Sequence, residues 1–311
     1  MRRSTLVIMG LGLIGGSLAR ALRAQGFCEQ IIGYGYRTPS LERGVELGVI
    51  DDFTLDLQEA VERADILVLA APTLVTAEIL SQVIPMLKGD DSDPVITDVA
   101  SVKGNLLQAA LNSNGGEIPP RLVLAHPIAG SERSGVDAST AELFVDHRVI
   151  LTPVEGNDAE AVELIREMWQ VTGAEVVDMG VAEHDAVLAA TSHLPHVLAY
   201  SLVDALAGSA ASEDIFRFAA GGFRDFTRIA SSDPVMWRDI ALANREALLA
   251  AMDQFSEHLA GLRSAIEQGD GEQLHETFTR AKAARDDGVL AVSAVSGQGL
   301  RWADLYRSRY P

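Results

Sequence analysis

Short apolar segments alternate with helical patterns along the first half of the chain. The apolar runs cover residues 6–9, 30–34, 66–70, 95–98, 122–125 and 148–152. Runs bounded by Gly, Asp or Pro are typical of strands that are buried on both faces of a sheet. Segments with helical periodicity lie between them, such as 14–25, which Gly26 is expected to end, and 57–64. This alternation predicts an α/β fold with a doubly wound, Rossmann-type parallel sheet.

The pattern changes after about residue 177, where strand-like runs give way to long helical stretches. One stretch covers residues 183–206 and contains Pro195. Because proline lacks a backbone donor and crowds the preceding turn, a kink is expected just before it. A second stretch is predicted over residues 234–267. Its apolar positions form one stripe at helical spacing: Leu248, Met252, Phe255, Leu259, Leu262 and Ile266.

The two halves predict a dinucleotide-binding domain over residues 1–177 and an all-α domain over residues 178–311. The net charge of -19 makes nucleic acid an unfavourable partner, and an anionic substrate then needs cations placed locally. Cys28 is the one cysteine, so no intramolecular disulfide forms. No run approaches the roughly 18 apolar residues that span a bilayer. We therefore expect a cytoplasmic protein that does not engage a membrane.

A glycine-rich turn follows the first apolar run. Gly10, Gly12 and Gly15 form the pattern G-x-G-x-x-G, with Leu13 and Ile14 between the last two glycines. In a strand-turn-helix context, the first glycine permits the tight turn, the second lets a pyrophosphate approach, and the third allows close helix packing. The turn predicts a dinucleotide site, and a purely structural turn is the alternative.

The end of the second predicted strand bears on the choice of cofactor. NAD-specific proteins place an Asp or Glu there to bind the ribose 2′-hydroxyl, but this chain has Gly35, followed by Arg37 and Thr38. Loss of the acid removes repulsion of a 2′-phosphate, and Arg37 can pair with that phosphate. This slightly favours NADP. NAD stays open, because Arg37 is equally compatible with an exposed loop.

Four segments occur together in one order along the chain. They are TDVASVK at 97–103, AHPIAGSE at 125–132, SHLPH at 192–196 and GGFRDFTRIA at 221–230. With the glycine turn they closely resemble the prephenate and arogenate dehydrogenase (cyclohexadienyl dehydrogenase) family, from the glycine loop to about residue 290. The resemblance implies NAD(P)-dependent removal of hydride from C4 of a cyclohexadienol, with loss of carbon dioxide, in tyrosine biosynthesis.

The resemblance also implies roles for residues around the cofactor. His126 matches the family's catalytic histidine, and a neutral imidazole suits removal of the C4 hydroxyl proton. Ser101 matches a serine that hydrogen-bonds this imidazole and the substrate. On sequence alone, Ser101 also suits a helix N-cap. Ala71, Pro72 and Ser101 join the glycine turn as expected cofactor contacts.

Substrate binding is expected from the later motifs. Arg228 matches an arginine that holds a substrate carboxylate, although an ion pair with Asp225 is the structural alternative. His193 matches a substrate-contacting histidine, whereas His196 is expected only to pack. No acidic or cysteine residues accompany these histidines, so no metal site is expected. The resemblance adds further residues of the substrate site or subunit interface: Ser131, Glu132, Asp225 and Trp237.

Several alternatives remain at this stage. Arogenate competes with prephenate as substrate, because no residue decides between an amino and a keto side chain. A β-hydroxyacid or imine-type dehydrogenase shares the domain plan but relies on a lysine or aspartate in its helical part. A non-catalytic cofactor-binding regulator needs only the glycine turn. We expect a monofunctional homodimer formed through residues 180–290, in which any tyrosine inhibition occurs at the active site.

Overall fold

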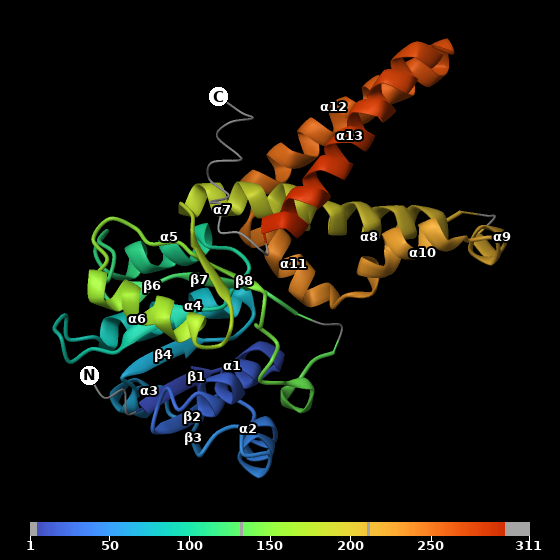
Figure 1. Cartoon of the computed structure of the whole chain (residues 1–311). Coiled ribbons are helices and arrows are strands. Elements are labelled where there is room, and N and C mark those ends of the chain that lie inside the picture. Colours follow the sequence, from blue (N-terminus) through green and yellow to red (C-terminus); the bar gives the residue numbers. More distant parts are fainter. Residues whose placement is uncertain (1–4, 131–132, 210–211, 296–311) are drawn as a thin grey trace. The chain divides into compact units, whose positions relative to one another are not determined.

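The computed structural model of the chain describes residues 5–130, 133–209 and 212–295 (Figure 1). The chain divides into two compact units, Met1–Ala251 and Met252–Pro311. The first unit contains both sheets and the helices as far as the first residues of α12 (Arg245–Gln268). The second contains the rest of α12 and α13 (Gly271–Val295).

A parallel sheet is the centre of the first unit, and its six strands within the described residues have the order β3-β2-β1-β4-β5-β6. The strand order reverses between β1 and β4, which is where open α/β sheets bind ligands. The doubly wound sheet predicted from the sequence is confirmed. The short edge strand β3 has no apolar run to reveal it, because its first residue is exposed and only its last is buried. The strands are β1 (Thr5–Met9), β2 (Gln30–Tyr34), β3 (Asp52–Thr54), β4 (Ile66–Leu69), β5 (Val95–Asp98) and β6 (Leu122–Val123).

Helices cover both faces of this sheet and give it two separate cores. Leu6 and Ile8 of β1 belong to one core, and Val7 and Met9 belong to the other. Burial of each such side chain stabilises the fold by about 1.5–3 kcal/mol. Helices α1 (Leu13–Ala24), α2 (Thr38–Glu46) and α6 (Ala159–Gln170) supply the first core, and α3 (Leu57–Arg63), α4 (Thr73–Val83) and α5 (Gly104–Ser113) supply the second. Gly26 has φ +61° and follows α1, as expected for a glycine that ends a helix.

A second, three-stranded sheet follows, with the order β7-β8-β9. Its strands are β7 (Ala125–Ile128), β8 (Arg148–Leu151) and β9 (Glu175–Asp178). The sequence predicted one strand over 122–125 with His126 just beyond its end. This was wrong in detail, because the chain leaves the parallel sheet at Leu124 and forms β7, in which His126 lies opposite Ile150 of antiparallel β8.

The chain beyond β9 is helical within the described residues. It runs through α7 (Val181–Leu188), the π-helical turn η3 (Ala189–His193) and α8 (Leu194–Ala207), continues through α9 (Ser212–Arg217), α10 (Gly221–Thr227) and η4 (Arg228–Ser231), and reaches α11 (Pro234–Ala243) and α12. The short turns η1 (Ile84–Met86) and η2 (Val136–Ala138) lie earlier in the chain. Before Pro195, where a kink was predicted, the helix widens into the π-helical turn η3, which ends at His193. The kink itself stays a prediction.

The single helix predicted over 234–267 was wrong. Asn244 divides it into α11 and α12, and its backbone (φ -103°, ψ 34°) leaves the helical region. The Asn244 side chain donates to the backbone carbonyl of Asp185, 59 residues earlier. Such a long-range contact is invisible to helical periodicity, which continues across the break.

The segment Val181–Ala207 is long and apolar enough, by length and composition, to cross a membrane. The expectation that no segment reaches this threshold was therefore wrong. However, this segment buries His184 and Asp185, and Asp185 accepts hydrogen bonds from the backbone of Lys103 and Gly104. These polar contacts join α7 to the first half of the chain.

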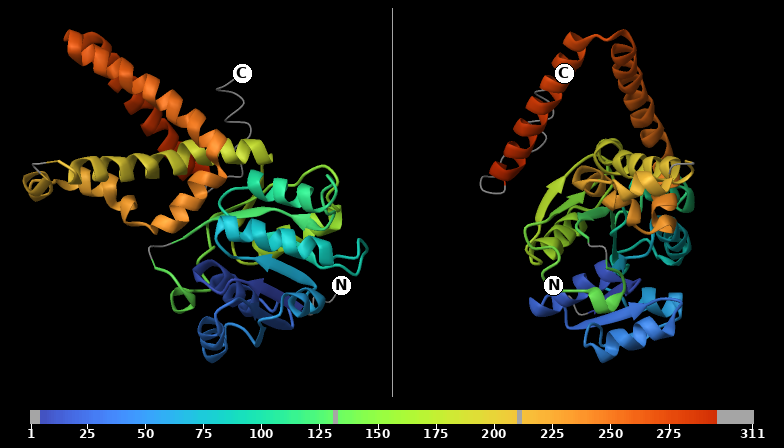
Figure 2. Two further views of the ribbon diagram at one scale, coloured as in Figure 1. Left: turned by 180° about the vertical axis from the view of Figure 1, so that it is seen from behind. Right: turned by 90° about the vertical axis from the view of Figure 1, so that its right-hand side faces the viewer.

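The second unit is a helical hairpin (Figure 2). Gly269 has φ +68° between α12 and α13, a conformation that glycine adopts without strain. The apolar stripe predicted on α12 is exposed along this unit: Phe255 is 36% exposed, Leu259 54% and Ile266 66%.

Candidate active site

The three glycines of the turn after β1 have different environments. A Cβ at Gly10 (φ +107°) would lie 2.5 Å from the carbonyl oxygen of Ala70, and one at Gly15 would lie 2.3 Å from the carbonyl oxygen of Gly10. A Cβ at Gly12 would meet no atom within 4 Å. Gly10 and Gly15 are thus required by the fold itself, whereas Gly12 borders open space.

The open space at Gly12 fits a dinucleotide. Gly12 is the N-cap of α1, whose first residues are Leu13 and Ile14, and no side chain caps this helix end. Uncapped backbone N–H groups and the positive end of the helix dipole favour a pyrophosphate here. Ala71 borders the same turn, since its backbone nitrogen lies 3.1 Å from the Cβ position of Gly10, and Pro72 is the N-cap of α4.

The segment after β2 presents a cation and no carboxylate. Gly35 follows the strand, and Arg37 is exposed at the N-cap of α2, which begins at Thr38. Within the described residues, Arg37 makes no ion pair. Its guanidinium is therefore accessible to a ligand beside the glycine turn.

His126 lies at one end of a buried chain of polar side chains. It lies on β7 with 8% of its surface exposed, and its Nδ1 is 2.9 Å from Nε2 of His184 on α7. The Nδ1 of His184 lies 2.8 Å from Oδ1 of Asp185. A histidine, a second histidine and a carboxylate thus form one continuous hydrogen-bonded line.

Asp185 also caps the amino end of α5. Its carboxylate accepts hydrogen bonds from the backbone N–H groups of Lys103 (2.9 Å) and Gly104 (2.7 Å). The prediction that Ser101 caps this helix was wrong, because α5 begins at Gly104 and its cap comes from a residue distant in sequence. Ser101 is half-buried in the loop after β5, and its hydroxyl makes no hydrogen bond with any described residue. Its role beside His126 stays a prediction.

A buried ion pair supports the strand that carries His126. Lys103 and Asp98 are both fully buried, and Nζ of Lys103 pairs with Oδ1 of Asp98 and donates to the Ala125 carbonyl at 2.6 Å. Asp98 Oδ2 in turn accepts from the Ala125 N–H at 3.2 Å. Burial lowers the pKa of Lys103 and raises that of Asp98, while their mutual attraction opposes both changes. The pair joins the end of β5 to the residue before His126.

A second cluster surrounds His193, at the end of η3. Asn244 Nδ2 lies 3.0 Å from His193 Nδ1, and the Trp237 ring packs edge-on against His193. His196 stacks on the other side of the cluster, with 3.5 Å between its ring centroid and that of Trp237. Within the described residues, Nε2 of His193 and Nε1 of Trp237 are buried without a hydrogen-bond partner. Buried polar atoms normally have a hydrogen-bond partner, so each of these two nitrogens calls for an explanation.

The predicted carboxylate-binding residue lies near this cluster. Arg228 is exposed at the start of η4. Burial, followed by the positive charge of Arg228, lowers the pKa of His196, which places the guanidinium within electrostatic reach of that ring. Asp225 is exposed on α10, and its predicted role is untested. Ser131 and Glu132, which were also predicted for the substrate site, lie outside the described residues.

The histidines of the site are held neutral. Burial lowers the pKa of His126 well below its usual value, and the neighbouring His184, Lys103 and His193 add to this effect. Burial likewise lowers the pKa of His184, and it lowers that of His193 to about 4. A neutral His126 is able to accept a proton at neutral pH.

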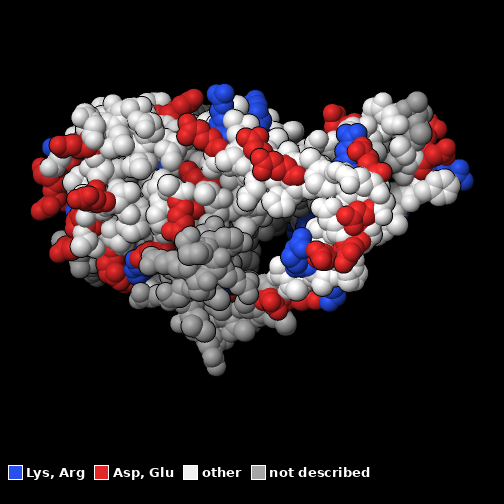
Figure 3. Space-filling model, turned by 90° about the horizontal axis from the view of Figure 1, so that it is seen from above, with Lys and Arg blue, Asp and Glu red and all other residues white. Residues whose placement is uncertain are grey.

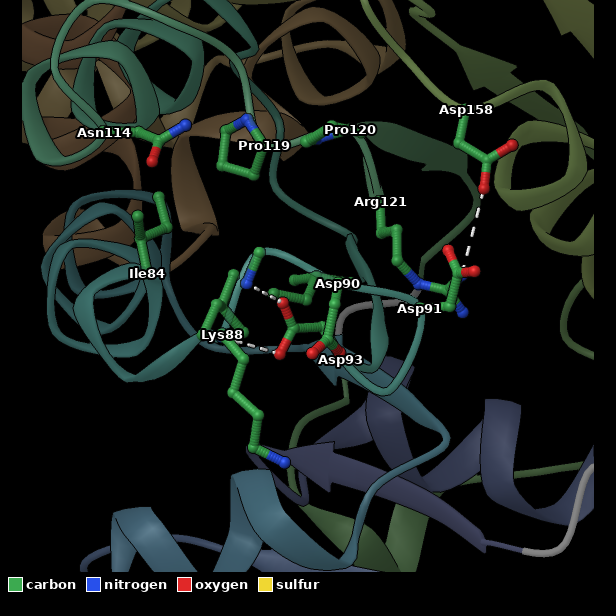
Figure 4. A pocket seen from close by; sticks show the side chains of 13 residues that line it. Ile84, Lys88, Asp90, Asp91, Asp93, Asn114, Pro119, Pro120, Arg121 and Asp158 are labelled. Carbon is green, nitrogen blue, oxygen red and sulfur yellow. Dashed lines mark hydrogen bonds and ion pairs between the residues drawn. The ribbon is translucent and has the colours of Figure 1, made fainter.

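Surface charge limits where an anionic ligand can bind among the described residues. Acidic side chains are spread over the face shown in Figure 3, so an anionic ligand depends on local cations such as Arg37 and Arg228. Another pocket lies where the chain enters β5 and β6, opposite the strand ends that carry the glycine turn (Figure 4). Asp93 lines part of this pocket. Its carboxylate accepts hydrogen bonds from the backbone N–H groups of Lys88 and Gly89 and thus orders the loop that contains all three residues.

Comparison with known proteins gives the family. The model "Prephenate dehydrogenase, nucleotide-binding domain" matches residues 18–178, and "Prephenate dehydrogenase, dimerization domain" matches residues 181–280. The chain belongs to the prephenate dehydrogenase family. The predicted domain boundary at 177/178 lies one residue before the end of the first match. It does not coincide with the two compact units, and it stays a prediction.

Relatives of known name agree with this family. A cyclohexadienyl dehydrogenase of Zymomonas mobilis is 39% identical over 90% of this chain and 94% of its own length. A prephenate dehydrogenase of Bacillus subtilis is 39% identical over 91% of this chain and 76% of its own. Among solved structures, A. aeolicus prephenate dehydrogenase, in complex with hydroxyphenyl propionate and NAD+, has 37% identity and a TM-score of 0.84 over 91% of this chain and 98% of its own. Synechocystis arogenate dehydrogenase has 30% identity and a TM-score of 0.77 over 91% and 99%.

In this member of the prephenate dehydrogenase family, the sequence predicted site roles for His126 and His193 but not the residues that hydrogen-bond them. His184 and Asp185 are buried polar residues on α7, and Asn244 is a buried polar residue at the break between α11 and α12. The sequence does show a histidine followed by an aspartate at positions 184–185, but this pair lies outside the four motifs. The family membership decides against the β-hydroxyacid and imine-type alternative.

Proposed function

We propose that this chain is an NAD(P)-dependent dehydrogenase that oxidatively decarboxylates prephenate to 4-hydroxyphenylpyruvate, a reaction of tyrosine biosynthesis. One structural observation carries the proposal: His126 is buried and neutral, and its Nδ1 is engaged by His184. Its Nε2 is then the atom able to accept a proton from substrate. A cofactor-binding regulator has no use for such a base.

The reaction needs a hydride acceptor, a base and the loss of carbon dioxide. When bound, the nicotinamide ring supplies the acceptor for the hydride that leaves C4. His126 takes the proton of the C4 hydroxyl as the C4–H bond breaks with its electron pair. Loss of carbon dioxide from C1 makes the ring aromatic, and the proton held by His126 returns to the oxygen at C4. Atoms and charge therefore balance without a metal or a second base.

Binding of the substrate carboxylates falls to the helical region of the first unit. Arg228 offers a guanidinium suited to bidentate pairing with a carboxylate. His193 and Trp237 each contribute a buried nitrogen atom that lacks a partner among the described residues. Ser101 is proposed to meet the C4 hydroxyl, which agrees with a hydroxyl group uncommitted within the described chain.

Arogenate is the second candidate substrate. A cyclohexadienyl dehydrogenase and a prephenate dehydrogenase match this chain equally at 39% identity, and an arogenate dehydrogenase shares its fold at 30%. Both substrates carry the same ring and C4 hydroxyl, so His126 serves either one.

For the cofactor, we propose that both NADP and NAD are used, with NADP slightly favoured. Gly35 leaves no carboxylate to repel a 2′-phosphate, and Arg37 is exposed without an ion pair in the described chain. The related A. aeolicus structure holds NAD+, which supports NAD as well. Replacing Arg37 with Ala is expected to raise the KM for NADP about tenfold, as for loss of one charged hydrogen bond, and to leave that for NAD unchanged. Lys88→Ala is the charge-matched control, and equal effects on both cofactors would contradict the assignment.

We further propose a cytoplasmic homodimer. The dimerization-domain match covers 181–280, and Phe255, Leu259 and Ile266 expose an apolar stripe in the single chain. Light scattering at micromolar concentration is expected to give twice the chain mass of 33.2 kDa, and the mass of a single chain would contradict it.

The proposed reaction is tested by its products. Purified protein is incubated with prephenate and NAD or NADP, and 4-hydroxyphenylpyruvate and carbon dioxide are measured. Formation of both in equal amounts supports the proposal. Tyrosine formation from arogenate, with no turnover of prephenate, would move the assignment to the second candidate.

A further inference from the structure

The line from His126 to Asp185 has only one arrangement of protons that satisfies all its contacts at neutral pH. Both oxygens of Asp185 accept backbone N–H groups, Oδ1 from Lys103 and Oδ2 from Gly104, so this carboxylate is an acceptor. The adjoining Nδ1 of His184 must therefore carry a hydrogen and donate it to Oδ1 at 2.8 Å.

His184 then determines the state of His126. Burial holds His184 neutral, so only one of its ring nitrogens carries a hydrogen. Because this hydrogen is on Nδ1, its Nε2 is a bare acceptor. The facing Nδ1 of His126, 2.9 Å away, must donate to it. His126 is thereby left with its lone pair on Nε2.

We propose that His184 and Asp185 are positioning residues that fix the Nδ1–H tautomer of His126 and hold its Nε2 as the proton acceptor for substrate. This inference rests on the proposed function. His184 is fully buried and its ring meets that of His126 at 65°, so the contact also sets the plane of the catalytic ring. When His126 gains a proton, the carboxylate of Asp185 stabilises the new charge through His184.

The arrangement has a second consequence for the fold. His126 lies on β7 in the part matched by the nucleotide-binding model, whereas His184 and Asp185 lie on α7 in the part matched by the dimerization model. Asp185 also caps α5, directly after the loop with Ser101. One carboxylate thus ties the catalytic ring and that loop to α7.

The first test is direct and needs no turnover. Long-range ¹⁵N–¹H NMR of histidine-labelled protein identifies which ring nitrogen carries hydrogen. The His126 signals are assigned among the seven histidines by their loss in His126→Asn. We expect hydrogen on Nδ1 in the wild type and a mixture of tautomers in His184→Leu. Hydrogen on Nε2 in the wild type would overturn the proposal.

The second test is kinetic. His184→Leu is expected to lower kcat about tenfold to hundredfold, as for loss of an outer-shell partner, with little change in KM for prephenate or cofactor. His184→Gln keeps an acceptor for the Nδ1–H of His126 and is expected to recover most of kcat. His147→Gln, at an exposed histidine, is the matched control. Equal losses in the Leu and Gln variants would mean that His184 only fills space, and would overturn the proposal.

These outcomes separate the inference from the proposed function. Urea unfolding of each variant shows whether a loss of rate reflects a loss of fold, and the Gln variant provides the comparison if the Leu variant is unstable. If the wild type turns over neither prephenate nor arogenate, the proposed function fails. The tautomer of His126, measured without substrate, still tests the positioning role of His184.

Discussion

Asn244 Nδ2 lies 3.0 Å from Nδ1 of His193 and 2.8 Å from the carbonyl oxygen of Asp185, so one side chain links the two clusters of the site. Since the amide nitrogen donates, Nδ1 of His193 is the acceptor, and the hydrogen of this neutral ring is on Nε2. His193 therefore faces a ligand as a donor of one hydrogen bond and carries no charge.

Loss of Asn244 is expected to affect both stability and binding. In Asn244→Leu, the buried Asp185 carbonyl loses its donor, so the free energy of unfolding should fall by about 1–3 kcal/mol. The KM for prephenate should rise as His193 loses its fixed tautomer. Asn112→Ala, at an exposed position on α5, is the control. A variant with unchanged KM would show that His193 does not contact substrate.

The buried histidines predict a pH dependence of stability. Because the pKa values of His126, His184 and His193 are lowered in the folded state from 6.5, the unfolded chain binds protons in a range where the native protein does not. Stability is therefore complete above pH 6.5 and is lost as pH falls, for His193 towards about 4. Urea unfolding between about pH 7 and 5 should show this decline. The slope should flatten in His193→Gln but not in His147→Gln, and a flat wild-type profile would contradict the assignment.

Activity, like stability, should decline as the pH falls. His126 must be neutral to accept a proton, and its pKa is lowered by burial, so kcat/KM should stay high below the value of 6.5 at which an ordinary histidine gains its proton. A pH–rate profile with its acid limb at or above 6.5 would argue against His126 as the base.

Two substitutions in the glycine turn should have different effects, one on ligand binding and the other on folding. Gly12→Ala meets no atom of the protein within 4 Å, so stability should be unchanged while cofactor affinity falls. Gly10→Ala, at φ +107° and with a Cβ 2.5 Å from the Ala70 carbonyl, should cost about 1–3 kcal/mol of stability. Fluorescence titration with NADPH and urea unfolding measure the two effects. Equal loss of stability in both variants would show that Gly12 is structural.

The buried ion pair between Lys103 and Asp98 predicts that substitutions of the two residues have strongly coupled effects on the free energy of unfolding. Lys103→Met leaves a buried carboxylate without its partner and should destabilise the protein by about 3–5 kcal/mol. Adding Asp98→Asn should recover part of this loss, because the remaining buried group is then uncharged. Unfolding of the two single variants and the double variant gives the coupling energy, and simple additivity would contradict a paired state.

Much of the architecture follows from local sequence. The buried strands β1, β2, β4 and β5 are apolar runs. The glycine turn after β1 has the G-x-G-x-x-G pattern, which is typical of few other local structures. The edge strands β3 and β9 were not predicted because they have no apolar run: one of three residues is buried in β3, and none of four in β9. The resemblance of the motifs predicted site roles for His126, His193 and Arg228, and these roles stay predictions.

What local sequence does not contain is the set of contacts across the chain. Asp185 caps a helix 81 residues earlier in the sequence, and Asn244 breaks a helix whose periodicity continues past it. These residues act through partners brought together only by the fold. Helical periodicity predicts the apolar face of α7. It does not predict that His184 on this helix contacts His126 on strand β7.

The most direct test of the account compares initial rates of NAD and NADP reduction, with prephenate as substrate, for the wild type and His126→Asn. We predict prephenate-dependent reduction by the wild type and a decrease of about 10²–10⁴-fold in kcat for the variant, as for loss of a general base, with cofactor affinity retained. Unchanged turnover in His126→Asn, or no turnover of prephenate by the wild type with either cofactor, would contradict it.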